Sequence, residues 1–360
     1  LHPQLQMKLL QFINTKTKTD KNPDGVQCIL SSHSPNISSK ADPSEIVMLG
    51  GGRAWPLRPG ETELAEADYK YLHKFLDATK ANVFFAKGLL FVEGDAENIL
   101  LPEIARLLGR PLENYGVSIV KCDNAGSWKR FAKLFLRQGK DREPDAWPST
   151  KVCALRDLDL WPTCAEEKAD GSNPHGFLKR KEPNAQGRGG NLTYWEESDA
   201  GQREEQIRAR IAEHKQEDGA SLERQGLKVC VSDRWTFEFC LARYGLLAEC
   251  CLALGIEAIE GTEDEKATYI QGKANKTDFA YDLADTLRSK LHAKVAEAIG
   301  AVEAEDGQQG VTPEETRARA ETEYAASLRS LLPPYIVDAI EFVTAPIVGG
   351  EQGEANAGPA

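Results

Sequence analysis

Two acidic segments, each placed directly after a short apolar run, constrain this chain more than any other feature. Glu93 and Glu97 follow the apolar run 89–92, and Asp157 and Asp159 follow a second one. Carboxylates gathered in one place repel one another and raise each other's pKa unless cations lie between them. Divalent ions with oxygen ligands are the usual partners of such a cluster. The pattern therefore predicts a metal site of the kind that handles phosphates.

Strand and helix signals alternate around both acidic segments. We expect strands over residues 89–92, 117–120, 151–155 and 227–231, and helices over residues 95–108 and 127–138. This alternation predicts a parallel sheet, and in such sheets functional groups gather beyond the carboxyl ends of the strands. The expected fold class is α/β: a Rossmann-like parallel sheet flanked by helices, with an appended or inserted helical domain.

The remaining chain divides into segments of different composition. Residues 1–60 predict a helix from Pro3, a buried strand over 26–30, and a strand with a glycine turn over 45–52. A charged amphipathic helix is expected over 61–80, and a polar insertion with one solvated helix over 162–224. Residues 241–345 predict a helical region, divided before its last helix by two prolines, and 346–360 a flexible tail. The sheet and its insertion thus occupy residues 82–240.

Composition narrows the class of protein. The net charge of −12 argues against nucleic-acid binding through the overall field, although local basic grooves and metal-neutralised carboxylates are compatible with it. The eight cysteines form no Cys-x-x-Cys pair, which indicates reduced thiols and a cytoplasmic location. The chain opens on Leu1 inside a helical pattern, which indicates part of a longer protein.

The spacing of the acids has both a structural and a functional interpretation. Glu93 and Glu97 span a strand end and the first turn of a helix, with Gly94 permitting the sharp turn between them. Acids at a helix N-terminus are also favoured by the helix dipole alone. Asp157 and Asp159 project to the same side of a strand, where aspartate is disfavoured, or form a polar strand end facing water.

The motifs resemble a known domain. Phe91-Val92-Glu93-Gly94 followed by Asp157-Leu158-Asp159 resembles a Toprim domain, which topoisomerases, primases, recombination proteins and a group of nucleases share. The segment 1–5 with 31–35 resembles the end of an ABC-type ATPase domain, with His33 at the position of its switch histidine. Together they resemble the OLD (overcoming lysogenization defect) family of nucleases. Because the Walker A loop and Walker B acids are absent, no complete ATP site is expected here.

The resemblance implies a function and a set of site residues. It implies a metal-dependent DNA endonuclease that nicks or cleaves phosphodiester bonds with two Mg²⁺ or Mn²⁺ ions. Glu93, Asp157 and Asp159 would hold one ion. Glu97 and Glu238 would hold the other, with Ser232 or Asp233 nearby or at a helix N-cap. Lys276 would be the catalytic lysine, with Lys273 as its nearest competitor.

Basic residues and family analogy suggest partners. Two basic patches are candidates for contact with DNA phosphates, although charge runs are more often solvated surface. They comprise Lys129, Arg130 and Lys133, and Lys179, Arg180 and Lys181. By analogy the partners include DNA, an N-terminal ATPase domain and a helicase, and the role is phage defence. The alternative is a Toprim-fold module that binds DNA or regulates without cleaving it.

Overall fold

The structure is a computed structural model, and it covers most of the chain. The described residues are 2–17, 23–122, 126–139, 148–169, 171–179, 192–194, 200–219, 225–304 and 312–346. Arg180, Lys181 and nearly all of the expected tail lie outside them.

A parallel four-stranded sheet forms the centre of the molecule. Its strands are β3 (Gly88–Val92), β4 (Val117–Lys121), β5 (Lys151–Arg156) and β8 (Lys228–Val231). They lie in the order β4-β3-β5-β8, and every neighbouring pair is parallel. The predicted α/β fold with a parallel sheet is therefore confirmed.

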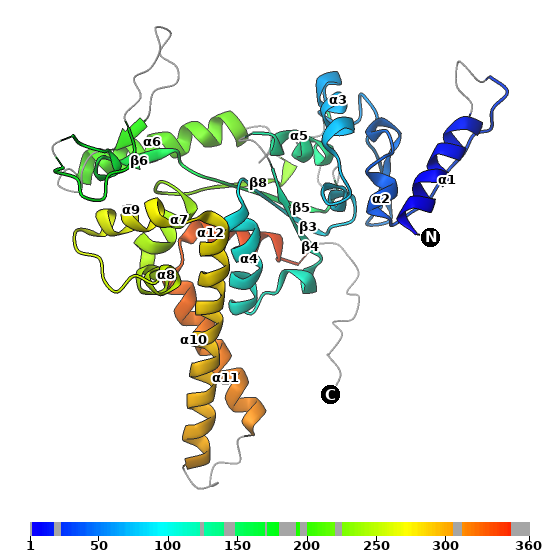
Figure 1. The fold of residues 1–360 in the computed structure, drawn as a ribbon. Coiled ribbons are helices and arrows are strands. Elements are labelled where there is room, and N and C mark those ends of the chain that lie inside the picture. Colours follow the sequence, from blue (N-terminus) through cyan, green and yellow to red (C-terminus); the bar gives the residue numbers. More distant parts are fainter. Residues whose placement is uncertain are drawn as a thin grey trace.

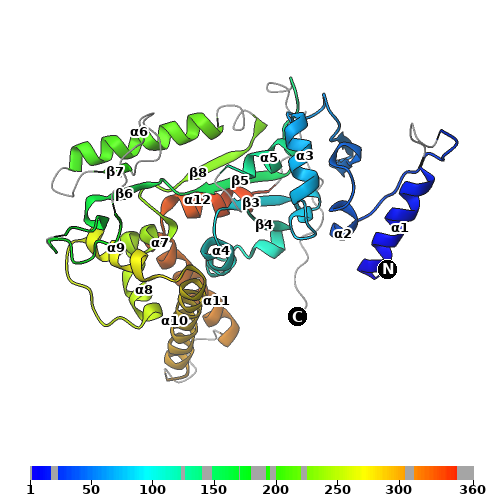
Figure 2. The ribbon, with the colours of Figure 1, turned by 45° about the horizontal axis from the view of Figure 1, so that its top comes forward.

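Helices cover both faces of this sheet, so its strands are buried on both sides. In β3 alternate residues enter different cores: Leu90 and Val92 pack on one face, Leu89 and Phe91 on the other. Figures 1 and 2 show α4, α7, α8 and α10 on one side of the sheet and α3, α5 and α6 on the other. Their bounds are α3 (Glu66–Phe75), α4 (Asp95–Leu107), α5 (Trp128–Ala132), α6 (Ala200–Gly219), α7 (Phe237–Leu241), α8 (Leu247–Leu254) and α10 (Lys276–Ala304).

The C-terminal part is helical, as expected. It adds α9 (Glu263–Lys273), α11 (Pro313–Leu331) and α12 (Pro334–Val343), and the proline pair does separate the last two. α10 and α11 pack together and extend away from the sheet (Figure 1). α12 returns to pack against β5 and β8. Among the described segments, none of the helices has both the length and the apolar character needed to cross a bilayer.

The N-terminal segment matches its prediction only in part. It contains α1 (Pro3–Lys16), α2 (Pro35–Ser38) and the hairpin of β1 (Val47–Gly50) with β2 (Arg53–Pro56). The expected strand over 26–30 is wrong: Val26 makes one isolated bridge with Thr17, and Ile29 is 92% exposed. Within the described part of the chain no neighbouring strand supplies a ladder, so these apolar residues remain uncovered.

Three helix predictions also need correction. The expected helix over 61–80 is the shorter α3, and the one over 127–138 ends after α5 in a 3₁₀ turn. The helix of the polar insertion is α6, and it is not solvated all round. Ile207 and His214 are buried. They lie seven residues apart, on one face of the helix, and α6 packs against β8. A short parallel pair joins the segment just before the insertion, β6 (Leu160–Pro162), to β7 (Leu192–Tyr194) within it.

Candidate active site

The first two acids meet at one edge of the sheet because β3 and β5 are neighbours. Phe91 lies opposite Ala154 in the parallel register, so Glu93 and Asp157 both leave the sheet at its carboxyl edge. Arg156, the last residue of β5, is buried and its Nε lies 3.2 Å from Glu93 Oε1. This contact orients the Glu93 carboxylate from the strand beside it.

Glu97 is placed by the turn between β3 and α4. Gly94 is the N-cap of α4, and Glu97 lies in its first turn, 6% exposed. A Cβ at Gly94 would stand 2.6 Å from Glu97 Oε2, so a larger residue here would displace this carboxylate from its present position. Glu97 Oε2 has no hydrogen-bond partner among the described residues, which is expensive for a buried polar atom.

Glu238 comes from the segment after β8. Thr236 is the N-cap of α7, and its side chain accepts a hydrogen bond from the Phe239 amide. The interpretation of Ser232 or Asp233 as N-cap is therefore wrong. Glu238 is 1% exposed, and neither carboxylate oxygen has a hydrogen-bond partner in the part of the chain that the structure describes.

Lys276, at the start of α10, places a second positive charge beside these acids, in addition to Arg156. Its Nζ lies 3.9 Å from Glu238 Oε1. The charge of Glu238, followed by those of Asp157, Glu97 and Glu93, raises the pKa of Lys276 despite partial burial, so this lysine is protonated at neutral pH. Lys273 instead lies over the ring of Tyr269, 5.5 Å from its centroid.

Burial and the neighbouring acids raise the pKa values of Glu97 and Asp157. Burial, followed by the charge of Glu238, raises the pKa of Glu97 to about 7. Burial, followed by the charges of Glu97, Glu238 and Glu93, raises the pKa of Asp157 well above its ordinary range. The one lysine only partly offsets these effects. The cluster of Glu93, Glu97, Asp157 and Glu238 (the acidic cluster) is thus short of positive charge and holds either protons or added cations.

Asp159 lies differently from the other predicted ligands. It is exposed, and its φ is +57°. Among the described residues, no other residue apart from glycine has a positive φ. The charges that most affect the pKa of Glu97 and Asp157 do not include Asp159. Its charge instead acts on His214 of α6, where it partly opposes the lowering of that histidine's pKa by burial.

The chemistry of the acidic cluster fits hard divalent ions, although its present geometry is not that of a formed site. Buried carboxylate oxygens of Glu97 and Glu238 that lack hydrogen bonds are the atoms a cation would satisfy. In the described segments, no three His, Cys, Asp or Glu side chains are already placed at ligand distance. Binding of an ion would therefore have to draw the carboxylates inward.

The basic residues expected to contact DNA have partners inside the protein. Lys133 Nζ lies 2.8 Å from Asp68 Oδ2, and Arg130 Nε lies 3.6 Å from Asp68 Oδ1. Arg130 also lies over the ring of Tyr71, 4.2 Å from its centroid. These contacts join α5 and the 3₁₀ turn after it to α3, and Lys129 is also on α5. Lys179 is exposed and lies 3.8 Å from Glu167, on a different part of the surface.

Three residues near the site were missed from the sequence. Arg156 had a usable signal, because it directly precedes Asp157 at the strand end. His214 and Tyr335 had none, since both are distant in sequence from the acids. Tyr335 of α12 is buried, its hydroxyl makes no hydrogen bond among the described residues, and Asp157 and Glu97 contribute to its raised pKa, which burial mainly causes.

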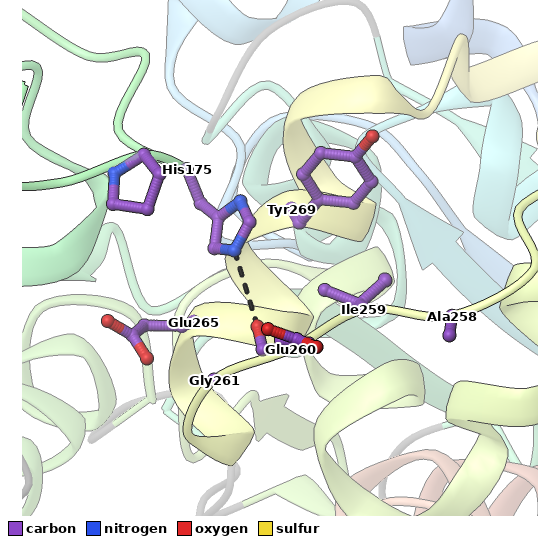
Figure 3. A pocket seen from close by; sticks show the side chains of 8 residues that line it. His175, Ala258, Ile259, Glu260, Gly261, Glu265 and Tyr269 are labelled. Carbon is purple, nitrogen blue, oxygen red and sulfur yellow. Dashed lines mark hydrogen bonds between the residues drawn. The ribbon is translucent and has the colours of Figure 1, made fainter.

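A pocket of about 480 Å³ lies between the insertion and α9, and it shares no residue with the acidic cluster. Figure 3 shows His175 and Tyr269 beside each other at this pocket, and their rings meet edge to face with centroids 5.0 Å apart. His175 Nε2 lies 3.4 Å from the Glu260 carbonyl oxygen.

The fold and the position of the acids define the class of this protein. A parallel sheet in the order β4-β3-β5-β8, with acids after its two central strands, is that of a Toprim domain. Residues 84–159 match the family model of the overcoming lysogenization defect protein-like TOPRIM domain. The chain therefore contains an OLD-like Toprim domain, and the matched segment includes Glu93, Glu97, Asp157 and Asp159.

Solved structures of the C-terminal regions of two OLD proteins are similar to this chain at low sequence identity. The C-terminal region of the Burkholderia pseudomallei OLD protein is 20% identical with a TM-score of 0.28, and the match covers 72% of this chain and 97% of that one. The C-terminal region of the Xanthomonas campestris pv. campestris OLD protein is 16% identical with a TM-score of 0.28, covering 72% and 95%. The comparison with curated proteins found no match.

Proposed function

We propose that this protein is a metal-dependent DNA endonuclease that nicks or cleaves phosphodiester bonds at the acidic cluster. The observation that carries the proposal is the placement of Glu93 and Asp157 after neighbouring parallel strands, together with buried Glu238, whose Oε1 lies 3.9 Å from Lys276 Nζ. Divalent cations bound to these carboxylates would neutralise the excess negative charge of the acidic cluster. Membership of the matched segment in the OLD-like Toprim domain supports nuclease chemistry over other uses of such ions.

The acids have distinct tasks in this proposal. Glu93 and Asp157, with Asp159 on the exposed side, would hold one Mg²⁺ or Mn²⁺ ion, and Glu97 with Glu238 would hold the second. When bound, such ions lower the pKa of a water and stabilise charge on the attacking and leaving oxygens of an in-line displacement. The buried position of Glu97 and Glu238 excludes water from one side of the site and strengthens every electrostatic contact there.

Lys276 acts in this proposal as a fixed positive charge. Its raised pKa keeps the ammonium protonated through the neutral range, so it cannot serve as a general base there. Partly exposed beside Glu238, the ammonium is placed to stabilise negative charge that develops on the phosphate. It can also donate a proton to a leaving oxygen as that charge develops.

Cleavage of supercoiled plasmid tests the proposal. Wild-type protein is incubated with EDTA, Mg²⁺ or Mn²⁺, beside Asp157→Asn and Glu238→Gln. The matched control is Asp95→Asn, because Asp95 lies between Glu93 and Glu97 in sequence but is exposed and paired with Lys121 at 2.8 Å. We expect nicking that requires a divalent ion, that falls at least about 100-fold in both site variants, and that survives in the control.

The same assay decides the alternative. If folded wild-type protein binds divalent ions but cleaves nothing under any condition, the Toprim domain is a binding or regulatory module. If both site variants nick as well as the wild type, the acidic cluster is not the active site. Nicking that persists in EDTA would contradict the role of metal.

A further inference from the structure

The loop that carries Asp157 and Asp159 contains an uncommon backbone conformation and is held by several contacts with other segments. Asp159 has φ +57°, a left-handed conformation that is uncommon for a residue with a Cβ and is maintained by surrounding contacts. A small rotation about this backbone would redirect both carboxylates. The contacts that hold the loop therefore bear directly on the direction of two proposed metal ligands.

Those contacts converge on the peptide groups of Leu158, between the two acids. Its N–H donates to Ser232 Oγ at 2.9 Å and to the Trp235 carbonyl at 3.1 Å, from the loop after β8. Its carbonyl oxygen accepts from His214 Nε2 at 3.1 Å and from Arg210 Nε at 3.4 Å, both on α6. A carbonyl can only accept, so His214 carries its proton on Nε2.

The contact with His214 is built deep in the fold. His214 is 2% exposed, and its other ring nitrogen, Nδ1, makes no hydrogen bond among the residues that the structure describes. The single polar contact of the buried ring is thus directed at the loop of the acids. A histidine that served only to fill space would not need to aim a donor at this one carbonyl.

α6 also contacts the loop between β8 and Glu238. Near the start of α6, Glu204 accepts from Arg234 Nη2 at 3.0 Å, in the loop that leads to Glu238. About three helical turns of α6, from Glu204 to His214, therefore link the segment after β5 to the segment after β8. Figure 2 shows α6 lying across this side of the sheet.

We propose that α6 is the positioning element of the active site, and that His214, assisted by Arg210, sets the direction of the Asp157 and Asp159 carboxylates by holding the Leu158 carbonyl. This inference rests on the proposed metal-dependent function. The sequence predicts that the helix of the insertion is solvated, whereas this inference gives that helix a direct part in forming the site. His214 and Arg210 are positioning residues, since neither is placed to contact substrate.

The test compares variants at His214 that differ in their ability to donate. His214→Leu removes the donor, His214→Gln keeps an amide donor at nearly the same reach, and Gln216→Leu is the control on an exposed position of the same helix. Two quantities are measured: the dissociation constant for Mn²⁺ by calorimetry, and the hydrogen-exchange rate of the Leu158 amide without metal. Thermal denaturation verifies the fold of each variant.

We expect His214→Leu to bind Mn²⁺ about 10-fold more weakly, the lower end of the usual effect of residues that orient metal ligands. Its Leu158 amide should exchange about 10-fold faster, as for the loss of one buried hydrogen bond. His214→Gln should restore most of both, and Gln216→Leu should change neither.

The possible results separate the inference about α6 from the proposed metal-dependent function. Unchanged Mn²⁺ affinity and unchanged exchange in His214→Leu would overturn the inference and leave the proposed function intact. If the wild type binds no Mn²⁺, the proposed function fails, and the exchange rate alone decides whether α6 holds the loop. If His214→Leu does not fold, Arg210→Met decides, with a smaller effect in the same direction expected and no effect counting against the inference.

Discussion

Replacing Glu97 with glutamine should make the metal-free protein more stable, although it removes a proposed ligand. The ordinary pKa of a glutamate is 4.5, and burial beside Glu238 raises that of Glu97 to about 7. The folded state therefore binds a proton more tightly than the unfolded state does. Its contribution to stability is fully present below pH 4.5 and is lost as the pH rises through 7.

The magnitude follows from this difference in pKa. A shift of roughly 2.5 pKa units at ~1.4 kcal/mol each means that ionised Glu97 destabilises the fold by about 3 kcal/mol at pH 8. Glutamine resembles the protonated side chain and avoids this penalty. In a cooperative unit of this size the gain corresponds to a rise in melting temperature of about 5 °C. Below pH 4.5 the two proteins should melt alike.

Thermal melts in EDTA at several pH values, repeated with saturating Mg²⁺, measure this effect. Glu314→Gln is the matched control, because Glu314 is an exposed acid in the first turn of α11. Loss of its favourable interaction with the helix dipole should destabilise by roughly 0.5 kcal/mol, the opposite sign. With Mg²⁺ the wild type should gain more than Glu97→Gln. Destabilisation of Glu97→Gln at pH 8 in EDTA would refute the reasoning and favour an ordinary helix-terminal acid.

Three further predictions concern neighbouring parts of the structure. Gly94→Ala should weaken Mn²⁺ binding by displacing the carboxylate behind it, whereas Gly201→Ala, in open space on a helix, should leave calorimetric binding unchanged; equal affinities would contradict the packing argument. Lys276→Met should slow single-turnover nicking while the folded protein still binds Mn²⁺, and an unchanged rate would exclude a catalytic role. Lys133→Met should lower the free energy of unfolding by about 1–3 kcal/mol, because buried Asp68 loses its closest partner. If the variant is as stable as the wild type but binds DNA more weakly, Lys133 is a DNA contact.

The sheet and the positions of its acids were predictable because they depend on local signals. Buried parallel strands appear as apolar runs, and the turn after a strand tolerates the acids and the glycine that the function needs. Glu93, Glu97 and Asp157 therefore came directly from the order of residues. Glu238 and Lys276 needed a resemblance to a known family, since nothing local separates them from ordinary helix-terminal charges.

Failures of prediction occurred where long-range contacts decide the structure. The apolar segment 26–30 has the composition of a strand but lacks a neighbouring strand among the described residues, so its β propensity is not realised. The pairing of Arg130 and Lys133 with Asp68, from another helix, could not be predicted from their spacing either, and their contact with DNA stays a prediction. A sequence pattern indicates which interactions a residue can make. The residues that pack beside it in the folded protein determine which of these interactions form.

The sequence by itself determined the parallel sheet and the placement of acids at the ends of two strands, because each follows from periodicity and backbone chemistry within a short window. Only the tertiary structure decided that β5 lies between β3 and β8, which gathers the acids into one cluster. It alone decided that α6 reaches back to hold Leu158, because that hydrogen bond joins residues 56 positions apart. The pKa values follow from the same cause, since burial and mutual repulsion exist only once distant segments have packed together.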